Sequence, residues 1–446
     1  IGAISAKALV VNATGKIVNV VTDGIPQATL SATPALAVGT NMELTVNFGT
    51  GEDYNAKAVL GARPIPAPWA ERALRECDGA ALLLAGGIDR WLEWLPRSTG
   101  KVVDGLPTVD EVSSHVATAA TAARAAFTDF AAWLKSRPAA DERSLGCGAD
   151  FFDLLLTRGH QCRRSRADLL ADAKARFAEA VAKLDADARA TVGSWSVAQE
   201  RMTLAHPPAS EYLAAFERTW ALCHQRAERQ DLVTWPDGHD WPLRYVLQPE
   251  WAREAAPYLY FLPYRSPAPE DAVRAHDYLV PPVPAEHPER HLSAWNHSVI
   301  KLNHVVHHGA LGHHVQNWHA YHRSQSRIGR VAAVDCSSRI TMFCGGTMAE
   351  GWACYATELM EETGFLTPLE KLSEQHSRVR FLARAVVDIS LHQGTMTFAD
   401  AVRFYADEVG MSEAAARGEA TKNSMFPGTG LMYWLGTQGI LDLREE

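Results

Sequence analysis

The sequence predicts a mainly helical protein with a small β insertion and a short β-rich segment at its N-terminus. Long alanine-rich segments with apolar residues three and four positions apart occupy much of the chain from Pro68 onward, a pattern typical of amphipathic helices. Short β-branched runs separated by turn residues fill the first 62 residues, which favours strands there. Prolines and aromatic residues gather between residues 231 and 290, where the prolines exclude long helices and favour short strands.

The N-terminal segment contains three candidate strands and ends in a proline-rich linker. The strands are predicted at Ala8–Val11, Ile17–Val21 and Met42–Val46, because each run is β-branched or alternating and is bounded by Gly, Asn, Asp or Pro. The sequence A-R-P-I-P-A-P at residues 62–68 is typical of a linker. We therefore expect a β-rich segment at residues 1–62 and a helical domain at residues 68–446.

Apolar spacing and capping residues predict the helices of the second part. We expect Asp150 to cap one helix and Ser412 to cap another, since both side chains accept backbone N–H groups readily. The helices themselves are predicted at Val112–Arg137, Arg166–Val192, Glu211–Arg229, Thr347–Glu362, Pro368–His392, Phe398–Asp407, Ser412–Asn423 and Gly430–Glu446.

Charge and hydropathy exclude two classes of partner. The chain of 446 residues is 47% hydrophobic and 21% charged, with a formal net charge of −9. This length allows a large core. Without a long basic run, an acidic protein is not expected to bind nucleic acid. No apolar run reaches the ~20 residues that a membrane span requires.

The cysteines give the expectation for location. Seven cysteines are scattered through the chain without a C-x-x-C pair, which does not suit a disulfide framework. We therefore expect free thiols and a cytoplasmic location, although the start at Ile1 rather than Met is compatible with a removed signal peptide. The last six residues, L-D-L-R-E-E, resemble a helix cut short, so we expect the protein to continue beyond them.

A cluster of histidines is the strongest chemical signal. Residues 303–316 read N-H-V-V-H-H-G-A-L-G-H-H-V-Q and contain His304, His307, His308, His313 and His314. Neighbouring imidazoles repel each other when charged and are costly to desolvate, so their clustering calls for a reason. Neutral imidazole is the commonest metal ligand in proteins, and the cluster therefore predicts a metal site.

The spacing leaves two ligand pairs open. Apolar residues predict a helix over Ile300–His308, and in a regular helix His304 and His308 converge at i and i+4. His307 and His313 are six residues apart and converge only if the helix breaks between them. Gly309 and Gly312 favour such a break, because glycine weakens a helix and allows close backbone approach.

Further polar side chains are candidates for the site, each with a structural alternative. Glu350 and Glu358 share one helix face, where Glu350 also suits the positive end of the helix dipole. Arg384, Asp388 and His392 share the face of an otherwise apolar helix, so they either contact ligand or substrate or form a structural ion pair. Aromatic and basic residues of the proline-rich segment are candidates for a cleft wall or for core packing: Tyr260, Tyr264 and Arg265.

Four motifs in order resemble the bacterial family known as domain of unknown function 885. The resemblance covers roughly Ile65–Glu446 and is specific from about His297 onward. The first family motif, H-E-A-Y-P-G-H-H followed by L-Q, is matched by His307, Gly312, His313, His314 and Gln316. The second, E-G-W-A-x-Y-x-E, is matched by Ala349–Ala353, Tyr355 and Glu358, and the third, R-A-x-x-D-x-x-x-H, by Arg384–Asp388 and His392. The fourth, P-G-x-x-x-x-Y-x-x-G, is matched by Pro427, Gly428, Tyr433 and Gly436.

This resemblance implies a metallopeptidase-like domain, by analogy with helical zinc peptidases. It implies that zinc or another divalent metal is held by His307, His313 and Glu350. Beside these ligands, we expect catalytic groups at His308, Glu358, Asp388 and Tyr433. We expect substrate contacts at Arg384, His392, Tyr264 and Arg265.

The chain departs from the family motif at one critical position. His308 stands where the motif has glutamate, which in zinc peptidases is the general base that activates water. We expect a metal-dependent hydrolase acting on a peptide or another amide or ester bond, with His308, Glu358 or Asp388 as the base. The alternatives are a catalytically inactive, peptidase-like protein that binds peptides and, because two histidines and a carboxylate also suit iron, an iron enzyme.

Overall fold

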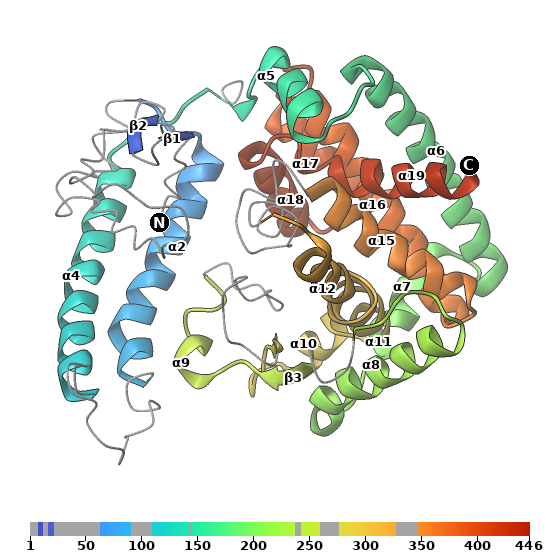
Figure 1. Ribbon diagram of the computed structural model, residues 1–446, viewed down its shortest axis with the longest axis horizontal. Coiled ribbons are helices and arrows are strands. Elements are labelled where there is room, and N and C mark those ends of the chain that lie inside the picture. Colours follow the sequence, from blue (N-terminus) through green and yellow to red (C-terminus); the bar gives the residue numbers. More distant parts are fainter. Residues whose placement is uncertain are drawn as a thin grey trace.

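The computed structural model of the chain describes residues 8–11, 17–21, 63–90, 109–141, 145–236, 242–258, 276–326 and 346–446 (Figure 1). For residues 8–11, 17–21 and 109–112 the description is of the backbone alone. The described chain is mainly helical, as predicted. Its α-helices are α2 (Ala67–Leu82), α4 (Val109–Lys135), α5 (Ala149–Leu154), α6 (Arg166–Val192), α7 (Trp195–Leu204), α8 (Tyr212–Arg229), α9 (Glu250–Arg253), α10 (Pro288–Ala294), α11 (His297–Val299), α12 (His313–Arg323), α15 (Gly346–Glu362), α16 (Pro368–His392), α17 (Phe398–Asp407), α18 (Glu413–Met425) and α19 (Met432–Glu445).

Short segments of π-helix or 3₁₀-helix adjoin several of these α-helices. Three are π-helical, with i→i+5 hydrogen bonds, and one is a 3₁₀ turn. They are η1 (Leu83–Gly87), η3 (Leu155–Gly159), η4 (the 3₁₀ turn, Ala209–Glu211) and η5 (Ile300–Gly309).

The described strands form two small two-stranded sheets. β1 (Ala8–Val11) pairs antiparallel with β2 (Ile17–Val21), at the positions predicted. β3 (Leu243–Leu247) pairs parallel with β4 (His276–Val280), which confirms a β insertion within the proline-rich segment. The third predicted strand, Met42–Val46, lies outside the described residues, and the proposed domain boundaries stay a prediction.

Helix boundaries agree with the prediction where the capping chemistry is strong. α6, α16 and α17 have the predicted bounds. Thr367 and Thr397 begin α16 and α17 with full capping boxes, in which a threonine hydroxyl and an acidic side chain three residues later each bind the other's backbone N–H. Ser412 caps α18 as expected, by accepting from the Ala415 N–H. The predicted cap at Asp150 is wrong, because α5 begins after Gly148 (φ 87°) and Asp150 lies inside the first turn.

Two apolar cores lie side by side in the larger part of the molecule. One joins α5, α6, α7, α16, α17 and α18, and the other joins α8, the β3–β4 pair, η5 and α15. In Figure 1 the paired helices α2 and α4 lie beside this larger part. Helices α12 and α15 lie near the middle of the larger part. No helix in the described ranges has an apolar stretch long enough to cross a membrane.

Helices α15 and α19 cross with their backbones in close contact. A Cβ atom placed on Gly436 would lie 1.9 Å from the carbonyl oxygen of Thr347 and 2.8 Å from the Cα of Gly351. Thr437 also donates its hydroxyl to the Gly351 carbonyl at 3.3 Å. Only glycine at both positions permits this approach, so the crossing fixes the position of α15, which carries Glu350.

Candidate metal centre

The histidine stretch begins in a π-helix, which corrects the regular helix predicted over Ile300–His308. The wider i→i+5 turns of η5 run to Gly309, and such turns are frequent at functional sites. An apolar pattern does not distinguish the two helix types over so few residues. Two tryptophans accommodate the carbonyls that the break releases: the indole N–H of Trp220 donates to Gly309 O at 2.8 Å, and that of Trp352 donates to Leu311 O at 2.9 Å.

The glycines permit the break by close backbone contact, as predicted. A Cβ atom on Gly312 would lie 1.8 Å from the carbonyl oxygen of His307. One on Gly309 would lie 2.2 Å from the hydroxyl of Tyr245. With these two residues the chain ends η5, turns sharply and begins α12 at His313.

The break brings His307, His313 and Glu350 together. The Nε2 atoms of His307 and His313 each lie 3.4 Å from Oε2 of Glu350. The two imidazole rings are 4.9 Å apart and nearly perpendicular. His313 is 1% exposed, and the Glu350 side chain is 14% exposed. Glu350 lies beyond the first turn of α15, so the helix dipole does not explain its position.

These distances suit a tetrahedral zinc ion. Zinc binds imidazole nitrogen and carboxylate oxygen at about 2.0–2.2 Å, so two donors at a tetrahedral angle are about 3.3–3.5 Å apart. Oε2 of Glu350 is buried and makes no hydrogen bond of normal geometry, although it lies near both imidazoles. Two imidazole nitrogens and a carboxylate oxygen held at these distances fit a shared cation.

His308 lies against the same donors. Its ring centre is 4.7 Å from that of His307 and 5.4 Å from that of His313, and the three histidines place ligand atoms within 4.8 Å of one another. Nδ1 of His308 lies 2.6 Å from the carbonyl oxygen of Asn303. Since a carbonyl only accepts, Nδ1 carries the proton and Nε2 keeps its lone pair.

The electrostatics of the cluster favour an ionised Glu350 and a neutral His308. Burial raises the pKa of Glu350, but hydrogen bonding and charge from His307 and His313 outweigh it and hold that pKa well below its usual value. Burial and the same two neighbours lower the pKa of His308 well below its usual value. Neutral imidazole with ionised carboxylate is the state that binds metal.

His304 and His314 point elsewhere, which excludes the regular-helix ligand pair. Nδ1 of His304 lies 2.6 Å from the hydroxyl of Tyr278, and its ring stacks on Trp295 at 4.1 Å. His314 packs edge-on against His276 at 5.3 Å. Both are therefore core histidines, and the broken-helix interpretation is the one that the structure supports.

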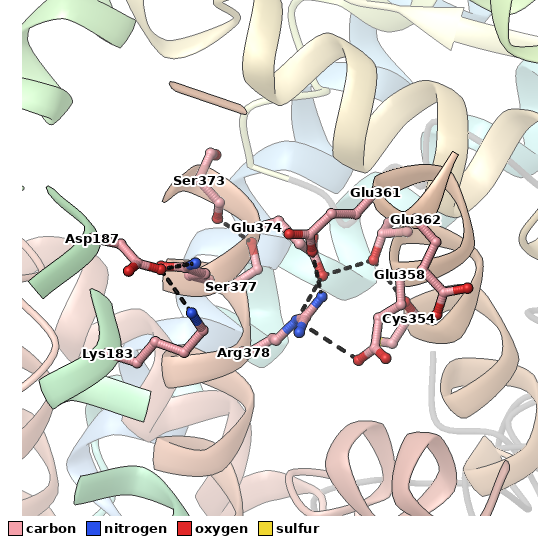
Figure 2. A network of polar contacts seen from close by, with 12 residues as sticks. Lys183, Asp187, Cys354, Glu358, Glu361, Glu362, Ser373, Glu374, Ser377 and Arg378 are labelled. Carbon is pink, nitrogen blue, oxygen red and sulfur yellow. Dashed lines mark hydrogen bonds and ion pairs between the residues drawn. The ribbon is translucent and has the colours of Figure 1, made fainter. Parts of the chain in front are cut away.

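Glu358 does not reach the cluster. It lies eight residues beyond Glu350 on α15, about 12 Å along the helix axis. Figure 2 shows it directed at Arg378, whose Nε is 3.7 Å from Oε1 of Glu358, while the same guanidinium also pairs with Glu361 and Glu374. The structure thus places Glu358 in a polar network between α15 and α16 rather than beside the histidines.

Asp388 and His392 hold the loop between α18 and α19. Asp388 is fully buried and accepts the backbone N–H groups of Gly428 at 3.1 Å and Leu431 at 3.0 Å. Nε2 of His392 lies 2.9 Å from the carbonyl of Asn423, and Nδ1 accepts from the N–H of Cys147 at 3.1 Å. A structural role therefore fits Asp388 and His392 better than contact with a ligand or substrate, because backbone groups form hydrogen bonds with their polar atoms.

The burial of Asp388 predicts a pH-dependent contribution to stability. Burial raises its pKa from 3.8 to about 7, against the backbone N–H groups that favour the anion. The native state therefore binds a proton that the unfolded state has released, and this contribution is full below about pH 4 and is lost as the pH rises through 7. In Asp388→Asn the free energy of unfolding, measured with denaturant at several pH values, should lack this dependence, which is at most about 4 kcal/mol.

Arg384 of α16 and Tyr433 of α19 lie against each other. Arg384 forms a bidentate ion pair with Glu419 at 2.6 and 2.8 Å. Its guanidinium lies 5.0 Å from the ring centre of Tyr433, which stacks on Phe381 at 5.2 Å. Arg384 is thus occupied by a carboxylate of the protein itself. Tyr264 and Arg265 lie outside the described residues.

Sequence reasoning missed two cations in this neighbourhood, Arg380 and Lys422. Arg380 precedes Arg384 by one helical turn, and Lys422 stands shortly before the Pro427–Gly428 turn. The four-residue spacing of the two arginines was a usable signal for the first. Nothing in the sequence near Lys422 relates it to residues on α15 or α19.

The fold and the donor set define a helical protein with a candidate metal centre between η5, α12 and α15. The chain belongs to the family described as bacterial protein of unknown function (DUF885), whose model matches residues 56–446. This confirms the resemblance noted from the four motifs.

Two solved structures share the fold. One is described as a putative lipoprotein of unknown function from Shewanella oneidensis, with 18% sequence identity, a TM-score of 0.58, and coverage of 83% of this chain and 67% of that one. The other is described as the putative lipoprotein from Colwellia psychrerythraea, with 17% identity, a TM-score of 0.59, and coverage of 80% and 60%. This chain therefore spans about two thirds of their length. Comparison with curated proteins finds no match.

Proposed function

We propose that the protein is a metal-dependent hydrolase that cleaves a peptide bond or another amide or ester bond. The observation that carries this proposal is the pair of 3.4 Å distances from Glu350 Oε2 to the Nε2 atoms of His307 and His313. Two imidazoles and one carboxylate leave a tetrahedral position open for water or substrate, as in catalytic zinc sites. The same set also suits iron, which remains the lesser alternative.

The proposal gives each residue of the centre a role. Zinc, or another divalent ion, would supply Lewis-acid chemistry that polarises the carbonyl and activates water. His307, His313 and Glu350 would hold it. His308 would accept the proton of the attacking water at Nε2, and its Nδ1–H bond to the Asn303 carbonyl stabilises the resulting imidazolium charge.

A second candidate function is peptide binding without hydrolysis. One observation favours it: His308, His307 and His313 place ligand atoms within 4.8 Å of one another, so His308 is as well placed to bind the ion as to take a proton. If it binds the ion, the described part of the centre has no base where the family motif has glutamate. The protein would then keep the scaffold but not the reaction.

Substitutions at His308 separate the two functions. If the protein is a hydrolase with His308 as base, His308→Gln should lower kcat/KM on a peptide library by about 100-fold or more, since general bases contribute about 10²–10⁴-fold. His308→Glu should retain activity. Hydrolysis by His308→Glu alone, with an inactive wild type, would contradict the hydrolase proposal and support the binding protein.

The two similar structures also bear on location. Both are described as lipoproteins, and we propose on this basis that the protein is exported to the cell envelope, in place of the cytoplasmic location first expected. In the described residues the cysteines are free thiols, which fits either location. Fractionation of the native bacterium, with antibody detection, tests the proposal, and recovery in the cytosol would contradict it.

A further inference from the structure

Two cations, Lys422 and Arg380, have no carboxylate partner among the described residues. Lys422 of α18 donates to the hydroxyl of Tyr433 at 3.5 Å, and its Nζ lies 5.6 Å from the centre of that ring. Arg380 of α16 has its Nε buried without a hydrogen-bond partner. Within the described ranges neither side chain forms an ion pair. Unpaired cations in partly buried positions are costly, so their presence calls for an anion.

The nearest acid is already occupied. Glu419 forms two hydrogen bonds with Arg384, at 2.6 and 2.8 Å. Burial and the charge of Arg384 lower the pKa of both Lys422 and Arg380. Three cations therefore lie near Glu419, and among the described residues it is Arg384 alone that forms an ion pair with it.

The cluster adjoins the metal centre. The charge of Glu350 is one of the influences that raise the pKa of Lys422, so the two side chains are close enough to interact. Cys354, one turn after Glu350 on α15, packs with Tyr433 and Phe381, and the guanidinium of Arg380 lies 5.8 Å from the ring centre of Phe381. Tyr433 is held rigidly, since its ring is parallel to that of Phe381 within 6° at 5.2 Å, and rigid donors lose little entropy on binding.

We propose that Arg380, Lys422 and the hydroxyl of Tyr433 form a subsite for a carboxylate of the substrate. The carboxylate is either the C-terminus of a peptide or an acidic side chain. That the carboxylate belongs to a substrate rests on the proposed function, whereas the existence of the subsite is inferred from the two cations without ion-pair partners. Charge-assisted hydrogen bonds from arginine and lysine are the strong contacts by which proteins select carboxylates. A hydrolase with this subsite would cleave close to the anionic group.

Calorimetry with non-hydrolysable probes tests the subsite separately from catalysis. The first probe is a ketomethylene analogue of N-acetyl-Ala-Ala with a free carboxylate, and the second is its C-terminal amide. The third is the corresponding N-acetyl-Glu-Ala amide, which carries only a side-chain carboxylate. Each is titrated into the zinc-loaded full chain, into Arg380→Gln and Lys422→Gln, and into Arg403→Gln, a control that removes a charge from the exposed face of α17.

The expected result is that a carboxylate probe binds the wild type at least about 10-fold more tightly than the neutral amide. Each cluster variant should lose about that factor, and the control variant none. Preference for the first or the third probe identifies the carboxylate as C-terminal or side-chain. Equal binding of acid and amide, or unchanged binding in both cluster variants, would overturn the subsite. Carboxylate binding without hydrolysis of any peptide would instead retain the subsite and remove the hydrolase.

Discussion

His307→Ala should purify without the stoichiometric zinc that we expect in the wild type, and it should keep its helical fold. His307 supplies one of three donors, and the ring nearest to its own is that of the partly buried His308, at 4.7 Å. Loss of a group that only orients a ligand costs about 10–100-fold in metal affinity, so loss of the ligand itself should cost more than about 100-fold. Element analysis after dialysis measures the metal, and circular dichroism measures the fold.

The matched control is His319→Ala, which removes an imidazole from the same helix as His313. Nε2 of His319 lies 3.0 Å from the carbonyl oxygen of Thr234, away from the three donors. This variant should retain zinc. Because a ligand that binds only the native state stabilises it, a chelator should lower the Tm of the wild type and of His319→Ala but leave His307→Ala unchanged. Equal metal content in wild type and His307→Ala would exclude the centre, and iron in place of zinc would favour the iron enzyme.

The ligand pair was predictable from sequence only as one of two alternatives. The six-residue separation of His307 and His313 required a break, and Gly309 and Gly312 indicated where it would occur. The π-helical form of the preceding turns was not predictable. Apolar residues at 300, 302, 305 and 306 suit an α-helix and a π-helix almost equally. The structure favours His307 and His313, because His304 instead contacts Tyr278 through a hydrogen bond and Trp295 through ring stacking.

Roles that depend on distant partners were beyond sequence reasoning. The boundaries of α16 were predictable from its apolar period, and the capping box that fixes its start is also local. Whether Arg384 and Asp388 on that helix contact substrate or protein depends on Glu419 and on backbone N–H groups around Gly428, more than thirty residues away. The sequence of the helix that carries a buried carboxylate does not show whether that carboxylate accepts hydrogen bonds from a distant loop.

Gly436→Ala should destabilise the protein by about 3 kcal/mol or more. Its new methyl group would lie 1.9 Å from the carbonyl oxygen of Thr347 and 2.8 Å from the Cα of Gly351. Both are backbone atoms of α15, which cannot rotate away as a side chain can, so the two helices must separate. Overpacking of this kind costs about 1–3 kcal/mol even where side chains can adjust. Denaturant unfolding of the variant and wild type measures the difference.

Gly439→Ala is the matched control, three residues further along the same helix. A Cβ atom there meets nothing within 4 Å, and alanine favours a helix over glycine by up to about 1 kcal/mol, so this variant should be equally or more stable than the wild type. The contrast extends to the centre, because Glu350 directly precedes Gly351 and moves with α15. Gly436→Ala should therefore also lose zinc under conditions where it remains folded, whereas Gly439→Ala should keep it. A stable, zinc-replete Gly436→Ala would mean that the close crossing of α15 and α19 does not position the carboxylate.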